Sequence, residues 1–137
     1  MKGISFFDTN ILVYADDDRS PDKQAVAISL FRECLSHGSA AVSLQVLQEY
    51  YAVVTRKLGV VPEHAQQKVG LLSLARVICF EARDVIAAIE LHRLQQISFW
   101  DAMIVHAARL SGAGVLYTED LQHGSTIAGV RIVNPFL

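Results

Sequence analysis

Short apolar runs alternate along the chain with longer segments of helical periodicity. The apolar runs have the length of buried strands and occupy residues 3–7, 40–43, 76–80, 114–118 and 130–133. The helices predicted between them span residues 22–37, 44–58, 62–74, 82–94 and 98–110. Short buried strands that alternate with helices are typical of a mostly parallel sheet covered on both faces. We therefore predict a three-layer α/β fold in which residues 1–137 form a single domain.

Composition limits where the protein acts. The chain of 137 residues is 52% hydrophobic, but no apolar stretch approaches the roughly 20 residues that a membrane span needs. The N-terminus shows no signal-peptide pattern, so we expect a cytoplasmic protein that does not bind membranes. Cys34 and Cys79 both fall in apolar segments. We expect two buried free thiols in a reducing compartment.

The overall charge does not indicate nucleic-acid binding. The formal net charge is −2, and a nucleic-acid contact would therefore have to be local. The basic residues are spread out, and the following are expected on solvated helix faces: Arg56, Lys57, Lys68 and Arg93. Most acids are also expected in solvent, including Asp16, Asp17 and Asp84, whereas His106 is expected to be a satisfied core or interface residue.

Four acidic residues fall where a solvated charge is not expected. Asp8 directly follows the first predicted strand and Asp120 follows the strand over residues 114–118, and the carboxyl ends of parallel strands meet at one edge of a sheet. Glu49 and Asp101 lie early in their helices, so both can point toward the same edge. Four carboxylates together need a compensating charge, and oxygen-only ligands favour Mg²⁺ or Mn²⁺ over Zn²⁺.

Each of these acids also has a purely structural interpretation. Asp101 fits a capping box at the start of its helix, and Asp120 fits a turn. Asp8 can cap a short helix that follows it, which is compatible with metal binding. Glu49 has the weakest such explanation, because its neighbours are largely apolar. Taken together, the four acids favour a metal site over four separate structural roles.

Four segments occur in a fixed order at compatible spacing: "FFDTNILVYA", "QEYY", "SFWDAMIVHAA" and "LYTEDLQHG". In these segments, and over essentially its whole length, the sequence resembles the PIN-domain ribonucleases, most closely the bacterial VapC-type toxins of toxin–antitoxin pairs. The resemblance implies a sheet of about five parallel strands and a homodimer. It also implies inhibition by a cognate antitoxin whose tail lies across the acidic groove.

The resemblance assigns roles to six residues. It implies that Mg²⁺, or Mn²⁺ in its place, is bound by Asp8, Glu49, Asp101 and Asp120, with Thr118 positioning the attacking water and Asn10 orienting Asp8. One departure concerns the segment after Asp120, where some relatives carry an additional carboxylate and this chain has His123 nearby. The choice between one and two metal ions therefore stays open.

The function expected from this resemblance is magnesium-dependent cleavage of RNA phosphodiester bonds, with a 5′-phosphate and a 3′-hydroxyl as products. Transfer RNA, ribosomal RNA and messenger RNA are all open as substrates. One alternative is an inactive PIN-like module that only binds RNA or protein. A phosphoacceptor receiver domain is less favoured, because the chain has no Lys after Lys68, and a phosphatase beginning Asp-x-Asp is less favoured because "DTN" lacks the second acid.

Overall fold

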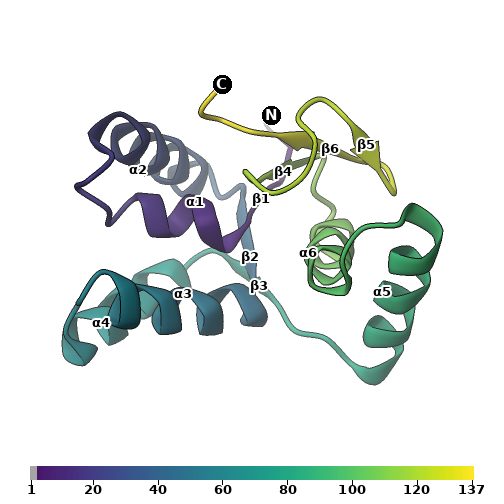
Figure 1. Cartoon of the computed structure of the whole chain (residues 1–137), viewed down its shortest axis with the longest axis horizontal. Coiled ribbons are helices and arrows are strands. Elements are labelled where there is room, and N and C mark those ends of the chain that lie inside the picture. The colour runs from purple at the N-terminus through teal and green to yellow at the C-terminus, as the bar shows by residue number, and fades with distance from the viewer. Residues whose placement is uncertain (1–2) are drawn as a thin grey trace.

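The computed structural model describes residues 3–137, which form one six-stranded sheet with helices on both faces (Figure 1). The strands are β1 (Ser5–Phe7), β2 (Ala40–Ser43), β3 (Arg76–Ile78), β4 (Val115–Tyr117), β5 (Thr126–Ile127) and β6 (Val130–Val133). The helices are α1 (Thr9–Tyr14), α2 (Pro21–Ser36), α3 (Leu44–Lys57), α4 (Pro62–Leu72), α5 (Ala82–Gln95) and α6 (Phe99–Leu110). The predicted three-layer α/β fold is confirmed.

The sheet has the order β3-β2-β1-β4-β6-β5. Five neighbouring strands are parallel, as the resemblance implied: β3, β2, β1, β4 and β6. Only β5 is antiparallel, and it pairs with β6. Helices α1 to α4 lie on one side of the sheet and α5 and α6 on the other (Figure 1). Helix α6 packs on β2, β4 and β6. Because both faces are covered, the central strands are buried, and Phe6, Leu116 and Ile132 are fully excluded from solvent.

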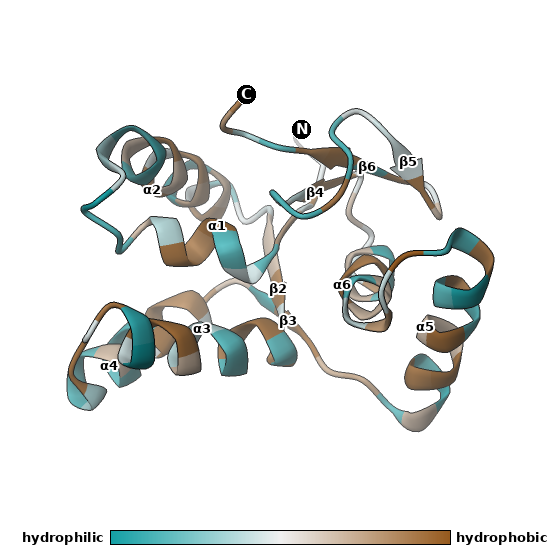
Figure 2. Cartoon of the chain, viewed as in Figure 1, coloured by the Kyte–Doolittle hydropathy of each residue, from teal (hydrophilic) through white to brown (hydrophobic). Residues whose placement is uncertain are grey.

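Part of the high hydrophobic content lies on the surface. Figure 2 shows hydrophobic segments along the central strands β4 and β6, which belong to the interior. It also shows hydrophobic segments on the outward helix α5. On α5, Ile86 and Leu94 are 66% and 71% exposed, and Trp100 at the start of α6 is 65% exposed. Among the described residues, no helix is both long and apolar enough to cross a membrane.

Strand β5 was not predicted from the sequence. Residues 126–127 pair with β6 through a two-residue hairpin whose turn, Ala128–Gly129, has φ values of 53° and 80°. Positive φ at both central positions is the type I′ geometry, which Asn-Gly or Asp-Gly usually signals. Ala at the first position gives no such signal, so the sequence does not indicate this hairpin.

The prediction for Cys79 was wrong. Strand β3 is the edge of the sheet and ends at Ile78, so Cys79 follows it into solvent and is exposed. Cys34 is buried as expected, and both cysteines are free thiols. A continuous apolar run at the end of an edge strand therefore does not imply burial.

Two acids in the loop after α1, both predicted to be solvated, instead form specific contacts. Asp16 accepts a hydrogen bond from the Tyr50 hydroxyl and pairs with Lys68 Nζ at 3.1 Å. Asp17 is buried and is held by Arg19, with Nε–Oδ1 at 2.9 Å. The Asp16 contacts connect the loop after α1 to α3 and α4, so they help to fix the orientation of α3 relative to α1.

Asp84 and His106 join the two helices on the other face of the sheet. Asp84 is buried and accepts hydrogen bonds from the Glu81 backbone N–H at 2.9 Å and from His106 Nε2 at 3.1 Å. The pKa of Asp84 is lowered, first by the Glu81 N–H and then by His106. Arg109 donates to the other ring nitrogen of His106 at 2.7 Å. His106 is therefore a satisfied core residue, as predicted, whereas the expectation for Asp84 was wrong.

The Tyr50 contact makes a prediction about stability. Tyr50→Phe removes a hydrogen bond to a half-buried carboxylate and should lower the free energy of unfolding by about 1.5–3 kcal/mol. Tyr51→Phe is the matched control, because Tyr51 lies on the exposed side of the same helix, and it should change stability by less than about 0.5 kcal/mol. Urea denaturation of both variants measures the difference. Equal effects of the two substitutions would show that the Asp16 contact does not stabilise the fold.

Candidate active site

The site forms where the strand order changes direction. From β1, the next strands along the chain, β2 and β3, lie on one side, whereas β4 and β6 lie on the other. The carboxyl ends of β1 and β4 are adjacent at this point, and the Asp8 N–H donates to the Tyr117 carbonyl at 3.0 Å. In open parallel sheets, ligands bind in the crevice at such a switch point. Asp8 and Thr118 are the first residues after these two strands.

Asp8 is both a helix cap and a buried acid. Its Oδ1 accepts a hydrogen bond from the Thr9 N–H at 2.7 Å at the start of α1, and its Oδ2 accepts one from the Thr118 hydroxyl at 2.8 Å. Asp8 is 6% exposed and Thr118 is fully buried. The two bonds use one lone pair on each carboxylate oxygen, which leaves each oxygen a further lone pair for a ligand.

Asn10 and Asp120 extend this network toward solvent. Asn10 Nδ2 donates to Asp120 Oδ2 at 3.0 Å, and Asn10 Oδ1 accepts from the Glu119 N–H at 3.3 Å. The Asp120 N–H donates to the Thr118 hydroxyl oxygen at 3.1 Å. The structure thus brings four of the six predicted residues into one hydrogen-bonded group. The Asn10 side chain bonds to Asp120 and not to Asp8. No hydrogen bond between Asn10 and Asp8 within residues 3–137 therefore supports the expected role of Asn10 in orienting Asp8.

Glu49 and Asp101 lie at the border of this group. Glu49 is exposed on α3 and accepts a hydrogen bond from Gln45 Nε2 at 2.7 Å. Asp101 lies in the first turn of α6, where its backbone N–H donates to the Ser98 hydroxyl oxygen at 3.0 Å. Within residues 3–137 the Asp101 carboxylate accepts no bond from the Ser98 backbone, so the cap at Ser98 does not occupy this acid.

The acids influence one another electrostatically. Burial raises the pKa of Asp8 to about 7, and the negative charges of Asp120 and Glu49 add to the effect, while the bonds from Thr118 and Thr9 oppose it. The pKa of Asp120 is also raised, first by burial and then by the charge of Asp101. Each of the four acids therefore takes part in a shared negative field at the carboxyl edge of the sheet.

The donor set suits a hard divalent cation. None of the four acids forms an ion pair within residues 3–137; the nearby Glu119 instead pairs with Lys23. Uncompensated carboxylates, of which Asp8 is buried and Glu49 exposed, supply the oxygen donors that Mg²⁺ and Mn²⁺ prefer. As the side chains stand, no three Asp, Glu, His or Cys residues in the described chain are close enough to hold a metal ion. Bringing a complete set of ligands onto one cation would therefore require side-chain adjustment.

A cleft of about 340 Å³ opens from this group between α1 and α3. Asp8, Glu49 and Asp120 line it, and Lys57 at the end of α3 lines it as well. Lys57 was predicted to lie on a solvated helix face. The signal that could have found it is its spacing of eight residues from Glu49, which places both on one side of a helix.

Glu119 is a second residue that the sequence analysis missed. Lys23 Nζ donates to Glu119 Oε2 at 2.6 Å, and the Tyr14 hydroxyl donates to Oε1 at 2.9 Å. Lys23 also lies over the Tyr14 ring, 4.7 Å from its centroid. These contacts tie the loop that carries Thr118 and Asp120 to α1 and α2. Tyr14 itself lines the cleft, with its hydroxyl bonded to Glu119 and its ring beneath Lys23.

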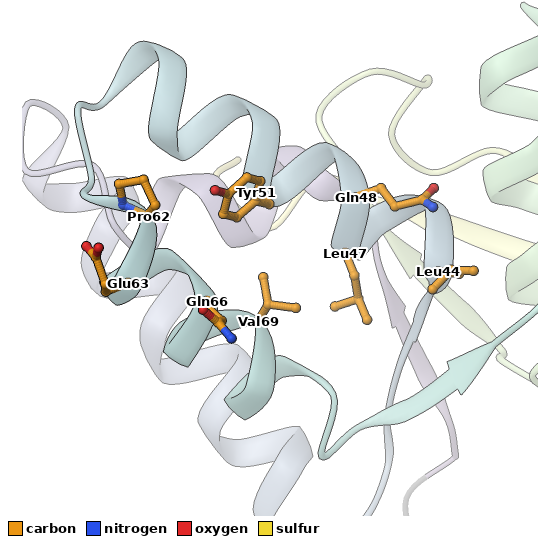
Figure 3. A pocket seen from close by; sticks show the side chains of 8 residues that line it. All are labelled: Leu44, Leu47, Gln48, Tyr51, Pro62, Glu63, Gln66 and Val69. Carbon is orange, nitrogen blue, oxygen red and sulfur yellow. The ribbon is translucent and has the colours of Figure 1, made fainter.

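A larger, mostly apolar pocket of about 710 Å³ lies on the other side of α3 (Figure 3). Figure 3 shows Leu47 and Tyr51 of α3 facing Val69 of α4 across it. The side chains of Leu47 and Tyr51 leave α3 on roughly the opposite side from Glu49, given about 100° per residue. The pocket contains none of the six predicted site residues.

Comparison with known families decides the classification. The model of the PIN domain matches residues 5–126 of the chain. The chain belongs to the PIN-domain family. A comparison with curated protein sequences finds no match. The position of the acidic group in this PIN domain rests on the geometry described above, because the family match by itself places no side chain.

Solved structures with this fold include several toxins. A toxin–antitoxin complex from Klebsiella pneumoniae is 21% identical with a TM-score of 0.66, covering 96% of this chain and 97% of that one. The Mycobacterium tuberculosis toxin VapC20, described as cleaving the sarcin–ricin loop, is 22% identical with a TM-score of 0.62, covering 93% and 98%. Rickettsia felis VapBC2, bound to a promoter DNA fragment, is 26% identical with a TM-score of 0.66, covering 94% and 96%. This PIN domain thus shares its fold with toxins over nearly its full length.

The raised pKa of Asp8 predicts how the metal-free protein responds to pH. An acid whose pKa is about 7 in the folded state and near 3.8 when unfolded destabilises the fold increasingly as pH rises between these values. Asp8→Asn keeps a good helix cap and removes this cost. In chelator, the variant should therefore melt a few degrees higher than wild type above pH 7 and lose this advantage below pH 4.

Thermal unfolding at several pH values measures this effect. Asp22→Asn is the matched control, because Asp22 is an exposed acid in the first turn of α2. The Asp22 variant should not gain stability as pH rises. If the melting temperatures of Asp8→Asn and wild type depend on pH in the same way, ionisation of Asp8 does not destabilise the folded protein.

Proposed function

We propose that this PIN domain is a magnesium-dependent endoribonuclease and the toxin of a toxin–antitoxin pair. The observation that carries the proposal is the buried Asp8, joined through Thr118 to Asp120 at the sheet's switch point, with no cation of the described chain to neutralise these acids. A protein that needed only the fold would gain stability by replacing Asp8 with a neutral residue. Retention of such an acid is expected where it holds a ligand.

The six predicted site residues have separate roles in the proposed hydrolysis of a phosphodiester bond. Asp8, Glu49, Asp101 and Asp120 would hold Mg²⁺, or Mn²⁺ in its place, which when bound supplies the positive charge that neutralises the phosphate oxygens. The Thr118 hydroxyl fixes one oxygen of Asp8, and Asn10 fixes Oδ2 of Asp120. Asp120 Oδ1 is then the atom that accepts the proton of the attacking water. The products are a 5′-phosphate and a 3′-hydroxyl.

The partners belong to the same proposal. Structures of similar fold are toxin–antitoxin complexes, which supports a protein antitoxin for this chain. We also propose a homodimer, and the exposed apolar residues on α5 are consistent with further protein contacts. We also propose that the cleft between α1 and α3 receives a single-stranded segment of RNA, with transfer, ribosomal and messenger RNA as the candidate substrates.

A cleavage assay tests the enzymatic part of the proposal. Purified protein is incubated with end-labelled total RNA in Mg²⁺, in Mn²⁺ and in chelator, and the ends of the products are mapped. Metal-dependent cutting is expected, and Asp8→Asn should reduce its rate at least about a hundredfold, because the charge stabilisation supplied through the carboxylates is worth several kcal/mol.

The control variant is again Asp22→Asn, which carries the same chemical change outside the cleft and should cut at the wild-type rate. Cutting that persists in chelator, or that survives Asp8→Asn unchanged, would contradict the assignment of the metal site. A folded protein that binds Mn²⁺ and RNA but cuts no RNA would favour the alternative of a PIN-like binding module.

A further inference from the structure

The cleft between α1 and α3 extends well beyond the acidic group. Helix α1 contributes Val13 to the wall of the cleft and α3 contributes Val53, so apolar side chains separate its two ends. Both helices start at the carboxyl edge of the sheet and run away from it side by side (Figure 1). The acids therefore lie where the helices begin, and Lys57 lies where α3 ends.

The cleft-facing side of α3 carries Glu49, Val53 and Lys57 at four-residue intervals. Residues at this spacing project from one side of a helix, and eight residues correspond to about 12 Å along its axis. The Cα of Lys57 therefore lies about two helical turns farther along the cleft than that of Glu49. An extended ligand that runs from the acids past Val53 is placed to contact Lys57.

The charge of Lys57 is available to a ligand. Within residues 3–137 Lys57 forms no ion pair, and it is the one basic side chain among the described residues that line the cleft. Asp17 also lines the cleft, but Arg19 already engages it with both Nε and Nη2, at 2.9 and 3.0 Å. Because Asp17 has Arg19 as its partner, it does not occupy Lys57.

We propose that Lys57 is a substrate-binding residue that contacts a backbone phosphate of the RNA other than the one cleaved. This inference rests on the proposed nuclease function and adds to it the path of the substrate, which runs from the acids along α3 past Val53 to Lys57. A protein of net charge −2 then gains its affinity for a polyanion from a local contact, and the chain direction at the acids is set by where that contact is made.

The test compares two substitutions that remove the same charge from neighbouring positions. Lys57→Gln removes the cleft charge while keeping most of the side-chain stem. Arg56→Gln is the matched control, because Arg56 is exposed on the same helix turn and does not line the cleft. Both are assayed with a single-stranded RNA that carries a mapped cleavage site, at several salt concentrations.

Lys57→Gln should raise KM on the order of tenfold while kcat changes less than twofold, because the contact is made equally in the ground and transition states. The slope of log(1/KM) against log salt should become shallower by about 0.7, the value for one phosphate contact on a single strand. Lys57→Arg should restore both quantities. Arg56→Gln should leave KM within about twofold of wild type.

Equal increases in KM for the two Gln variants would overturn the proposal, since the effect would then come from net charge. A fall in kcat with an unchanged KM would also overturn it. If wild type cuts normally and Lys57→Gln has wild-type KM and salt dependence, Lys57 has no role although the nuclease stands. If wild type cuts no RNA, the nuclease function fails first and the role of Lys57 fails with it.

Discussion

The burial of an uncompensated carboxylate at the junction of β1 and β4 is the constraint on which the rest of the site depends. Asp8 must follow β1 at once to cap α1, and the parallel pairing of β1 with β4 then places Thr118 beside it. Burial and the charges of nearby acids disfavour the ionised form of Asp8. Such an arrangement costs stability in the metal-free protein, and a bound divalent cation would offset that cost.

Contacts of residues outside the six predicted site residues hold the site in position. Glu119 is held by Lys23 and Tyr14, so the loop between Thr118 and Asp120 is attached to α1 and α2. The pairing of Asp16 with Tyr50 and Lys68 does the same for α3. Both groups consist of charged or hydroxyl side chains around one carboxylate. The helices that form the walls of the cleft are therefore held by these polar contacts and by the apolar core against which α1 and α3 pack.

The elements could be read from the sequence because their signals are local. Alternating apolar runs and helices, Pro21 and Pro62 at helix starts, and the acids after strands were enough for the fold class and for the order of the site residues. Hairpin β5–β6 could not be predicted, because Ala128 adopts a positive φ without the usual Asn or Asp. The pairs Asp16–Lys68 and Asp84–His106 were also missed, since each joins residues more than 20 positions apart.

The candidate site shows the same division between local and long-range information. The position of Asp8 and Asp120 after strands was enough to place them at one edge, whereas the contact of Asn10 with Asp120 depends on how α1 meets the loop after β4. Lys57 could have been found by helical spacing from Glu49, but only the packing of α1 against α3 turns that side of the helix into a cleft wall. Long-range packing thus decides which of many charged residues share a site.

Diffraction from crystals soaked in Mn²⁺, recorded so that the anomalous signal of manganese is measured, tests the central claim most directly. The expected result is an anomalous peak within coordination distance, about 2.0–2.3 Å, of an Asp8 carboxylate oxygen and at least one other of the four acids. A fully soaked crystal with no peak in this cleft, or with peaks only elsewhere on the surface, would contradict the claim that these acids form a metal site.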